Sequence, residues 1–348
     1  MNKGIFSIPV YDQHIDFHKI LDETTSYVLE AEKLGLNEAF FGEHIADKHE
    51  KITSSLMMVS SLSSLTKNIK LGTLTTNLNF YNPSVAASLI SMADNLCKGR
   101  LILGIGSGAN ISDIEAIGFL EKDNYKIMHE SFSLIIKILE SKDFIDLKSE
   151  NFKLSTNKTG NRDLGLGFFN PLYENRKNLE IIMPVLNKDS YNVKICAENN
   201  WSIAISNFCC EKLIENHIEN YLKFSKLVKK DALKKIKLLK LIHAIEDAKD
   251  TKKYSFDENS PFIKVINTLF KKLKTFNKHQ IFGEEVTNLK EAVNNTLLAG
   301  TPATINKYID RITQKYGEIG SFIYVTPPKT GYKHFDKSLE LFANNVKT

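Results

Sequence analysis

The chain has 348 residues, of which 42% are hydrophobic and 25% are charged, and its formal net charge is +5 at pH 7. This composition is typical of a globular protein with a sizeable core, and the length suits one large α/β barrel or two smaller domains. No apolar stretch is long enough to span a bilayer, and the first residues lack the pattern of a signal peptide.

Apolar runs and helical periodicities alternate along the first half of the chain. They predict strands over residues 4–9, 39–42, 69–78 and 101–106, separated by helices over 20–34, 54–65 and 83–96. Gly35, directly after the first helix, and Pro83, in the first turn of the third, are ordinary stop and start signals.

The second half continues the alternation less regularly. It predicts helices over 131–140, 190–199, 211–226, 261–276, 302–315 and 335–346, strands over 179–184, 202–206, 236–245 and 321–325, and loop over most of 151–178. Eight strands that alternate with helices or loops favour a closed (β/α)8 TIM barrel over an open doubly wound sheet. We therefore expect one α/β domain over residues 1–348, with a helical insertion at approximately 250–295.

Cysteine and lysine usage bears on the compartment and the partners. The four cysteines, Cys97, Cys196, Cys209 and Cys210, form no CxxC pair, so we expect reduced thiols in a cytoplasmic protein. Lysines concentrate over residues 212–278, but acidic residues interleave with them and no arginine cluster accompanies them. This pattern favours a solvated helix face, with neither nucleic acid nor membrane as a partner.

In a TIM barrel the chemistry lies at the C-terminal ends of the strands. The polar residues expected there are, in chain order, Glu43, His44, Thr75, Thr76, Asn77, Ser107, Gly108, Asn110, Asn187, Lys188, Asp189, Ser190 and Asn207. This rim is mostly uncharged and has one histidine. It offers neither the paired carboxylates of glycosidases nor a set of metal ligands.

Three segments resemble the bacterial luciferase-like family of flavin-dependent monooxygenases. AEKLGLNEAFFGEH, at residues 31–44, resembles the family's first helix, second strand and catalytic loop. LGTLT at 71–75, NP at 82–83 and DNLCKGRLILGIGSG at 94–108 match its third strand, third helix and fourth strand in spacing, and AGTP at 299–302 matches a turn near the end. The resemblance is strong over residues 1–140 and weak over 179–330.

The resemblance implies a flavin at the mouth of the barrel. Most members use reduced FMN and O2 to oxidise an organic substrate, here expected to be small and lipophilic, and the lack of a second nucleotide-binding domain suggests that a separate flavin reductase supplies the reduced flavin. Two alternatives stay open: an F420-dependent oxidoreductase, and a non-catalytic flavin-binding paralogue or partner subunit. The family's pairing and the small residues in helices 54–65 and 83–96 together predict a homodimer.

The matched positions also imply roles for single residues. His44 matches a histidine beside the flavin ring, where imidazole suits proton handling because its pKa lies near working pH. Glu43 is expected to orient His44 or a neighbouring loop, and the bond between Leu74 and Thr75 matches a cis peptide of several relatives. The expected cofactor-binding residues are Thr75, Asn77, Gly106, Ser107, Gly108, Asn110, Asn187 and Ser190. Among these, Thr75 is expected to bond to the flavin ring, and the residues of the loops at 107–110 and 187–190 are expected to bind the phosphate.

Three positions depart from the family's pattern. Ser107 stands where luciferase has a phosphate-binding arginine, and Ile45 stands where it has a second histidine. Asn187 and Lys188 replace a small residue and a proline of similar members. These departures are the reason for keeping the non-catalytic alternative.

Overall fold

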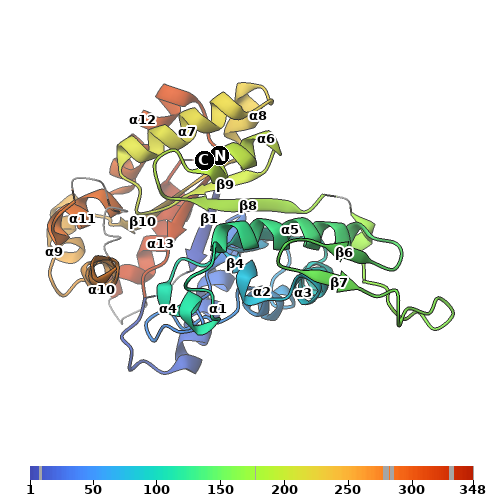
Figure 1. The fold of residues 1–348 in the computed structure, drawn as a ribbon. Coiled ribbons are helices and arrows are strands. Elements are labelled where there is room, and N and C mark those ends of the chain that lie inside the picture. The colour runs from blue at the N-terminus through green and yellow to red at the C-terminus, as the bar shows by residue number, and fades with distance from the viewer. Residues whose placement is uncertain (8–9, 177, 277–281, 283–285, 329–332, 348) are drawn as a thin grey trace. The chain divides into compact units, whose positions relative to one another are not determined.

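The computed structural model describes residues 1–7, 10–176, 178–276, 282, 286–328 and 333–347 (Figure 1). Its main strands are β1 (Asn2–Ser7), β2 (Glu38–Phe41), β3 (Lys70–Thr73), β5 (Leu101–Gly106), β8 (Glu180–Val185), β9 (Ser202–Ile205), β10 (Ile236–Ala244) and β12 (Ser321–Val325). Their hydrogen-bonded order is β10-β12-β1-β2-β3-β5-β8-β9, and β9 pairs with β10 again. The eight strands thus form a closed parallel barrel with surrounding helices, which confirms the predicted (β/α)8 fold.

The chain divides into two compact units. The first comprises Met1–Phe40, Lys48–Glu50 and Ile182–Thr348, and the second comprises Phe41–Asp47 and Lys51–Ile181. That the whole chain forms one domain stays a prediction, so each unit is described by itself. Among the described residues no helix has both the length and the apolar character that crossing a bilayer requires.

The first unit contains the strand neighbours β8, β9, β10, β12 and β1. Its helices are α1 (Phe17–Lys33), α6 (Tyr191–Glu198), α7 (Glu211–Phe224), α8 (Lys229–Leu233), α12 (Pro302–Tyr316) and α13 (Lys333–Asn345). All nine residues of β10 are buried, as expected for an inner strand that is covered on both faces. The last two residues of the strand predicted over 4–9 lie outside the described residues.

The predicted insertion begins after β10. It contains η3 (Ala248–Asp250), α9 (Thr251–Ser255), α10 (Pro261–Thr275) and α11 (Leu289–Thr296), followed by a short strand, β11 (Leu297–Gly300), that pairs with the end of β10. The helix predicted over 261–276 is therefore present as α10. Its buried face carries Phe262, Val265, Ile266 and Phe270. Part of the insertion lies outside the described residues.

The second unit contains β3, β4 (Thr76–Asn77) and β5, with η1 (Leu78–Phe80) after β4. Its helices are α2 (Ser55–Ser63), α3 (Pro83–Leu96), α4 (Ile111–Ala116) and α5 (Asn124–Glu140). The stretch predicted as loop contains β7 (Lys153–Ser155), which pairs with β6 (Asp146–Lys148) in an antiparallel hairpin, and η2 (Tyr173–Asn175). These strands of three residues, with polar ends, are too short to leave an alternating pattern in the sequence.

The strand predicted over 69–78 is interrupted in the middle. In the pairing with β5, Leu71 lies opposite Leu101, thirty positions further on, whereas Thr76 lies opposite Ile105, twenty-nine positions further on. One extra residue is therefore inserted between β3 and β4, as in a β-bulge. Such an insertion redirects the side chains around it, and Thr75 is the residue of the stretch 71–79 that is not buried.

Candidate active site

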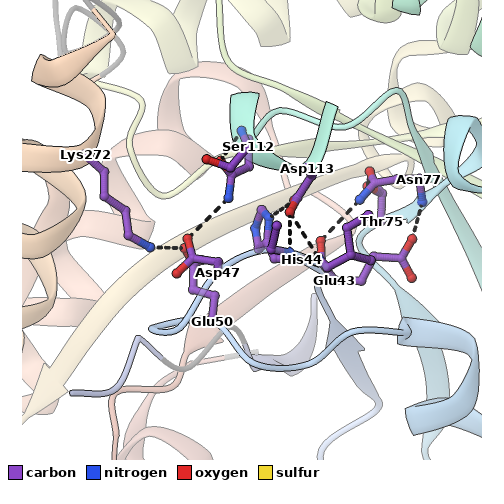
Figure 2. Close-up of polar contacts among 12 residues, drawn as sticks. Glu43, His44, Asp47, Glu50, Thr75, Asn77, Ser112, Asp113 and Lys272 are labelled. Atoms are coloured by element: carbon purple, nitrogen blue, oxygen red, sulfur yellow. Dashed lines mark hydrogen bonds and ion pairs between the residues drawn. The ribbon is translucent and has the colours of Figure 1, made fainter. Parts of the chain in front are cut away.

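His44 follows β2 and forms a pair with Asp113 (Figure 2). Its Nδ1 lies 2.8 Å from Oδ2 of Asp113, a side chain that is 1% exposed, whereas the His44 side chain is 17% exposed. The other carboxylate oxygen of Asp113 accepts hydrogen bonds from the amides of Ile45 and Ala46, at 3.1 and 2.8 Å. Asp113 therefore fixes both the imidazole and the backbone of the loop that carries it.

This geometry determines the tautomer of the His44 imidazole. A carboxylate accepts a hydrogen bond, so Nδ1 of His44 carries the proton and donates it to Asp113. The proton-accepting or proton-donating position of His44 is then Nε2. The arrangement is that of an acid–base histidine oriented by a buried carboxylate.

Glu43 has a different set of contacts from its neighbour. Its carboxylate accepts from the amide of Asn77 at 2.6 Å and from both the amide and the hydroxyl of Ser55 at 2.9 Å. The side chain of Asn77 also donates to the Glu43 carbonyl at 3.2 Å. Glu43 thus holds the β4 segment and the start of α2. Of the two roles expected for Glu43, orienting His44 or orienting a neighbouring loop, these contacts fit the second.

Burial raises the pKa of the Glu43 carboxyl to about 7, even though the hydrogen bonds from Asn77 and Ser55 and the nearby His44 lower it. Burial also raises the pKa of the Tyr81 hydroxyl to about 12, and the negative charge of Glu43 contributes to this rise. A buried carboxyl with a pKa in this range changes its charge under ordinary working conditions.

Thr75 lies at the bulge between β3 and β4. The peptide bond between Leu74 and Thr75 is cis, as the resemblance implied. The Thr75 hydroxyl donates to Oδ1 of Asn77 at 2.7 Å (Figure 2). A Cβ on Gly106 would lie 2.5 Å from that hydroxyl oxygen, so Gly106 leaves the space that the Thr75 side chain occupies.

Several contacts hold the glycine-rich turn after β5, residues 107–110, in place. The Ser107 carbonyl accepts from the Asn79 side chain at 3.0 Å, and Gly108 has a φ of +88°, a left-handed conformation that favours glycine. Asn110 is the N-cap of α4: its side chain accepts from the amide of Ser112 at 3.1 Å. These residues are half-buried, so the turn keeps contact with solvent.

The loop over residues 187–190 belongs to the first unit and precedes α6. Ser190 is the N-cap of α6, and its side chain makes no capping hydrogen bond. Asp189 accepts at 3.0 Å from the side chains of both Asn216 and Asn220 on α7, which holds the loop against that helix. Asn187 is exposed and Ser190 half-buried.

Within the second unit the structure brings together several of the predicted residues. Thr75, Asn77 and Gly106 contact one another, and Glu43 joins them through Asn77. Asn77 is 5% exposed and its side chain is bonded to Thr75 and Glu43, which suits a supporting role better than direct contact with a ligand. That Ser107, Gly108, Asn187 and Ser190 surround one anion stays a prediction.

Sequence reasoning did not find Asp113 or Ser55. Asp113 lies on α4, a helix of six residues that is too short to leave a periodic pattern. The signal in the sequence that could have indicated Asp113 is Asn110, three positions earlier. Asparagine is a favoured N-cap, and a carboxylate is favourable in the first turn of a helix because of the helix dipole. Nothing local to residue 113 indicates that α4 contacts the loop after β2.

The residues at this site fit a flavin. Thr75 and His44 are half-buried and border a buried hydrogen-bonded network, so they offer polar groups to a flavin ring. Ser107, Gly108 and Asn110 in the turn after β5 are also half-buried, which suits binding of a phosphate group. The fold and the site together define a (β/α)8 barrel protein with an imidazole–carboxylate pair after its second strand.

Comparison with known proteins agrees with this class. Residues 1–162 match the model of the family described as luciferase-like monooxygenase, the family that the sequence resembles. The chain is 28% identical to limonene 1,2-monooxygenase of Rhodococcus erythropolis over 136 residues, which are 39% of this chain and 35% of the relative. It is 24% identical to 2,5-diketocamphane 1,2-monooxygenase 1 of Pseudomonas putida over 229 residues, which are 64% of this chain and 61% of the relative.

Solved structures extend the likeness of the fold to the whole chain. The oxygenating constituent of 3,6-diketocamphane monooxygenase from Pseudomonas putida, in complex with FMN, has a TM-score of 0.82 at 18% identity, covering 99% of this chain and 97% of that one. An F420-dependent secondary alcohol dehydrogenase has a TM-score of 0.68 at 14% identity, covering 99% of this chain and 98% of that one.

Proposed function

We propose that this protein is a flavin-dependent monooxygenase that uses reduced FMN and O2 to oxidise a small lipophilic molecule. The observation that carries the proposal is the pair of His44 with the buried Asp113, at 2.8 Å, in the segment that matches the luciferase-like family. The limonene and diketocamphane relatives support it, since each is a monooxygenase by name. The structurally similar diketocamphane protein, which binds FMN, supports the choice of cofactor.

In this proposal the protein supplies binding, orientation and proton transfer. Thr75 and Gly106 would hold the ring, and the residues of the two loops, Ser107, Gly108, Asn110, Asn187 and Ser190, would bind the phosphate through their amides and hydroxyls. Bound reduced FMN supplies the reaction with O2. His44 takes or gives a proton at Nε2, Asp113 keeps the imidazole in the required tautomer, and a separate reductase supplies the reduced flavin.

F420-dependent hydride transfer is the second candidate. The chain is 29% identical over 139 residues to an F420-dependent glucose-6-phosphate dehydrogenase of Amycolatopsis mediterranei, and 30% identical over 138 residues to a 5,10-methylenetetrahydromethanopterin reductase of Archaeoglobus fulgidus. These matches are as close as those to the monooxygenases, so identity alone does not favour either cofactor.

An anaerobic binding titration separates the candidates. The purified protein is titrated with FMN, reduced FMN and F420, and binding is followed by absorbance and fluorescence. We expect reduced FMN to bind most tightly. Preferential binding of F420 would replace the proposal by the second candidate, and binding of none of the three would favour a non-catalytic protein.

A further inference from the structure

The Ser55 hydroxyl stands between the Glu43 carboxylate and the backbone of Thr75. Its Oγ lies 2.9 Å from Oε2 of Glu43, 3.2 Å from the Thr75 carbonyl oxygen and 3.2 Å from Oγ1 of Thr76. Ser55 is fully buried and Glu43 is 2% exposed. Water therefore does not compete readily for these hydrogen bonds.

A serine hydroxyl has one hydrogen to donate and two lone pairs to accept with. Ser55 can therefore make a full hydrogen bond to Glu43 or to the Thr75 carbonyl, but not to both. When Glu43 is ionised, the shorter, charge-assisted bond to Glu43 takes the hydrogen. When Glu43 is protonated, its own O–H donates to Ser55, and the Ser55 hydrogen turns to the Thr75 carbonyl.

We propose that Ser55 relays the protonation state of Glu43 to the Thr75 carbonyl, which makes Glu43 and Ser55 positioning residues for the peptide between Thr75 and Thr76. The proton on Glu43 comes from solvent, and no bond other than O–H···O hydrogen bonds is exchanged. The consequence for flavin binding rests on the proposed function. The relay itself depends only on contacts within the second unit.

The surroundings of Glu43 allow it to change its charge. Burial is the main cause that raises the pKa of its carboxyl to about 7, and the groups that face it are Ser55, the Asn77 amide, Tyr81 and His44. Asn77 is bonded to the other carboxylate oxygen, Oε1, at 2.6 Å and can only donate there. Oε2 accepts from the Ser55 amide at 2.9 Å, and this amide too can only donate, but Oε2 also contacts the Ser55 hydroxyl, which can accept. A proton on Oε2 therefore has the Ser55 oxygen as its acceptor.

Carbonyl NMR of the protein without flavin tests the relay directly. The sequence contains two Thr-Thr pairs, Thr24–Thr25 and Thr75–Thr76. Labelling threonine with ¹³C at the carbonyl and ¹⁵N at the amide therefore gives two coupled signals, of which the Thr24 signal, on α1, serves as an internal control. The spectra are recorded across the titration of Glu43, which is followed through its own ¹³C carboxyl signal.

In the wild type we expect the Thr75 carbonyl signal to move with the same midpoint as the Glu43 carboxyl. In Ser55→Ala the Glu43 signal should still titrate, at a higher pH because the carboxylate has lost a donor, but the Thr75 signal should lose most of its movement. Ser61→Ala, in the same helix, is the matched control and should behave like the wild type. A Thr75 signal that stays still in the wild type, or that moves equally in Ser55→Ala, would overturn the relay.

FMN affinity tests the consequence of the relay. With Glu43 ionised the Thr75 carbonyl is left to accept from a ligand, so FMN should bind about 2- to 10-fold more tightly on the alkaline side of the titration, the value of about one hydrogen bond. Ser55→Ala should remove this dependence. A protein that binds no FMN contradicts the proposed function while the NMR result still decides the relay, whereas an affinity that varies equally in Ser55→Ala contradicts the relay alone.

Discussion

At the scale of single residues, the adjacent side chains of Glu43 and His44 are held by different partners and have different roles. His44 is oriented by Asp113 and remains half-buried, whereas Glu43 is buried and holds Ser55 and Asn77. The resemblance to the luciferase-like family predicted a role for His44. Neither the resemblance nor the sequence pattern predicted Asp113, because only tertiary structure brings α4 to this loop.

Replacing His44 by alanine should abolish turnover without unfolding the protein. The side chain lies at a strand end and is half-buried, so little packing is lost, while general acid–base assistance is worth about 10²- to 10⁴-fold in rate. Turnover with reduced flavin, O2 and an accepted substrate measures the loss, and thermal unfolding is the control. Unchanged turnover in the variant would show that His44 has no proton-transfer role.

Asp113→Asn should reduce turnover by about 10²-fold while leaving flavin affinity close to that of the wild type. The asparagine amide can still accept from Ile45 and Ala46, but its NH2 group donates to Nδ1 of His44 and moves the imidazole proton to Nε2. The pH–rate profile and the flavin dissociation constant are measured together. An equal loss of flavin binding would instead assign Asp113 to the folding of the loop.

Glu43 should make the free energy of unfolding fall as pH rises from about 4.5 to about 7, because the folded state binds the proton more tightly than the unfolded chain in that window. The fall amounts to at most about 1.4 kcal/mol per pH unit, on the order of 2 kcal/mol in total. Denaturant unfolding of the wild type and of Glu43→Gln at both ends of the window isolates this component. It should be missing from the variant, and an identical pH dependence in the two proteins would contradict the assignment.

At the scale of elements, the short polar helices and strands leave no usable pattern in the sequence. The helix predicted over 83–96 is observed with those bounds because Asn82 caps it and Pro83 opens it, and the strand over 101–106 is a continuous apolar run. By contrast α4, β6 and β7 are too short to show periodicity, although α4 carries the carboxylate that orients His44. The pattern along a strand also cannot show the extra residue that places Thr75 at a bulge.

Helix α3 carries a second testable feature. Val85, Leu89, Met92 and Leu96 are 52%, 38%, 61% and 44% exposed, and their spacing puts them on one helix face. Two of the small residues in the helix over 83–96, Ala86 and Ala87, are buried within the protein, so the exposed apolar stripe is the better basis for the predicted homodimer.

Charging this stripe should therefore produce a monomer. Leu89→Lys combined with Met92→Lys introduces two like charges on the face, and light scattering measures the mass in solution. Leu164→Lys, at a leucine that is 70% exposed outside α3, is the matched control and should stay dimeric. A wild type that is already a monomer at working concentration would contradict the prediction.

At the scale of the whole molecule, the alternation of apolar runs was sufficient to predict the closed barrel, since each of the eight predicted strands is represented in it. Periodicity reports local burial, so it identifies strands and the polar residues that follow them. It does not report which loops meet, and the contacts of Asp113 and Ser55 are of that kind. The candidate site was therefore predicted at Glu43, His44, Thr75 and Asn77 but not at Asp113 and Ser55.

The reaction of protein-bound reduced FMN with O2 tests the central claim most directly. Protein loaded anaerobically with reduced FMN is mixed with oxygenated buffer in a stopped-flow instrument, and the return of flavin absorbance and the release of hydrogen peroxide are followed. We predict that bound flavin reoxidises with kinetics clearly different from those of free reduced FMN, and that His44→Ala and Asp113→Asn both alter these kinetics while still binding the flavin. Reoxidation at the rate of free flavin, in the wild type and in both variants, would contradict the account.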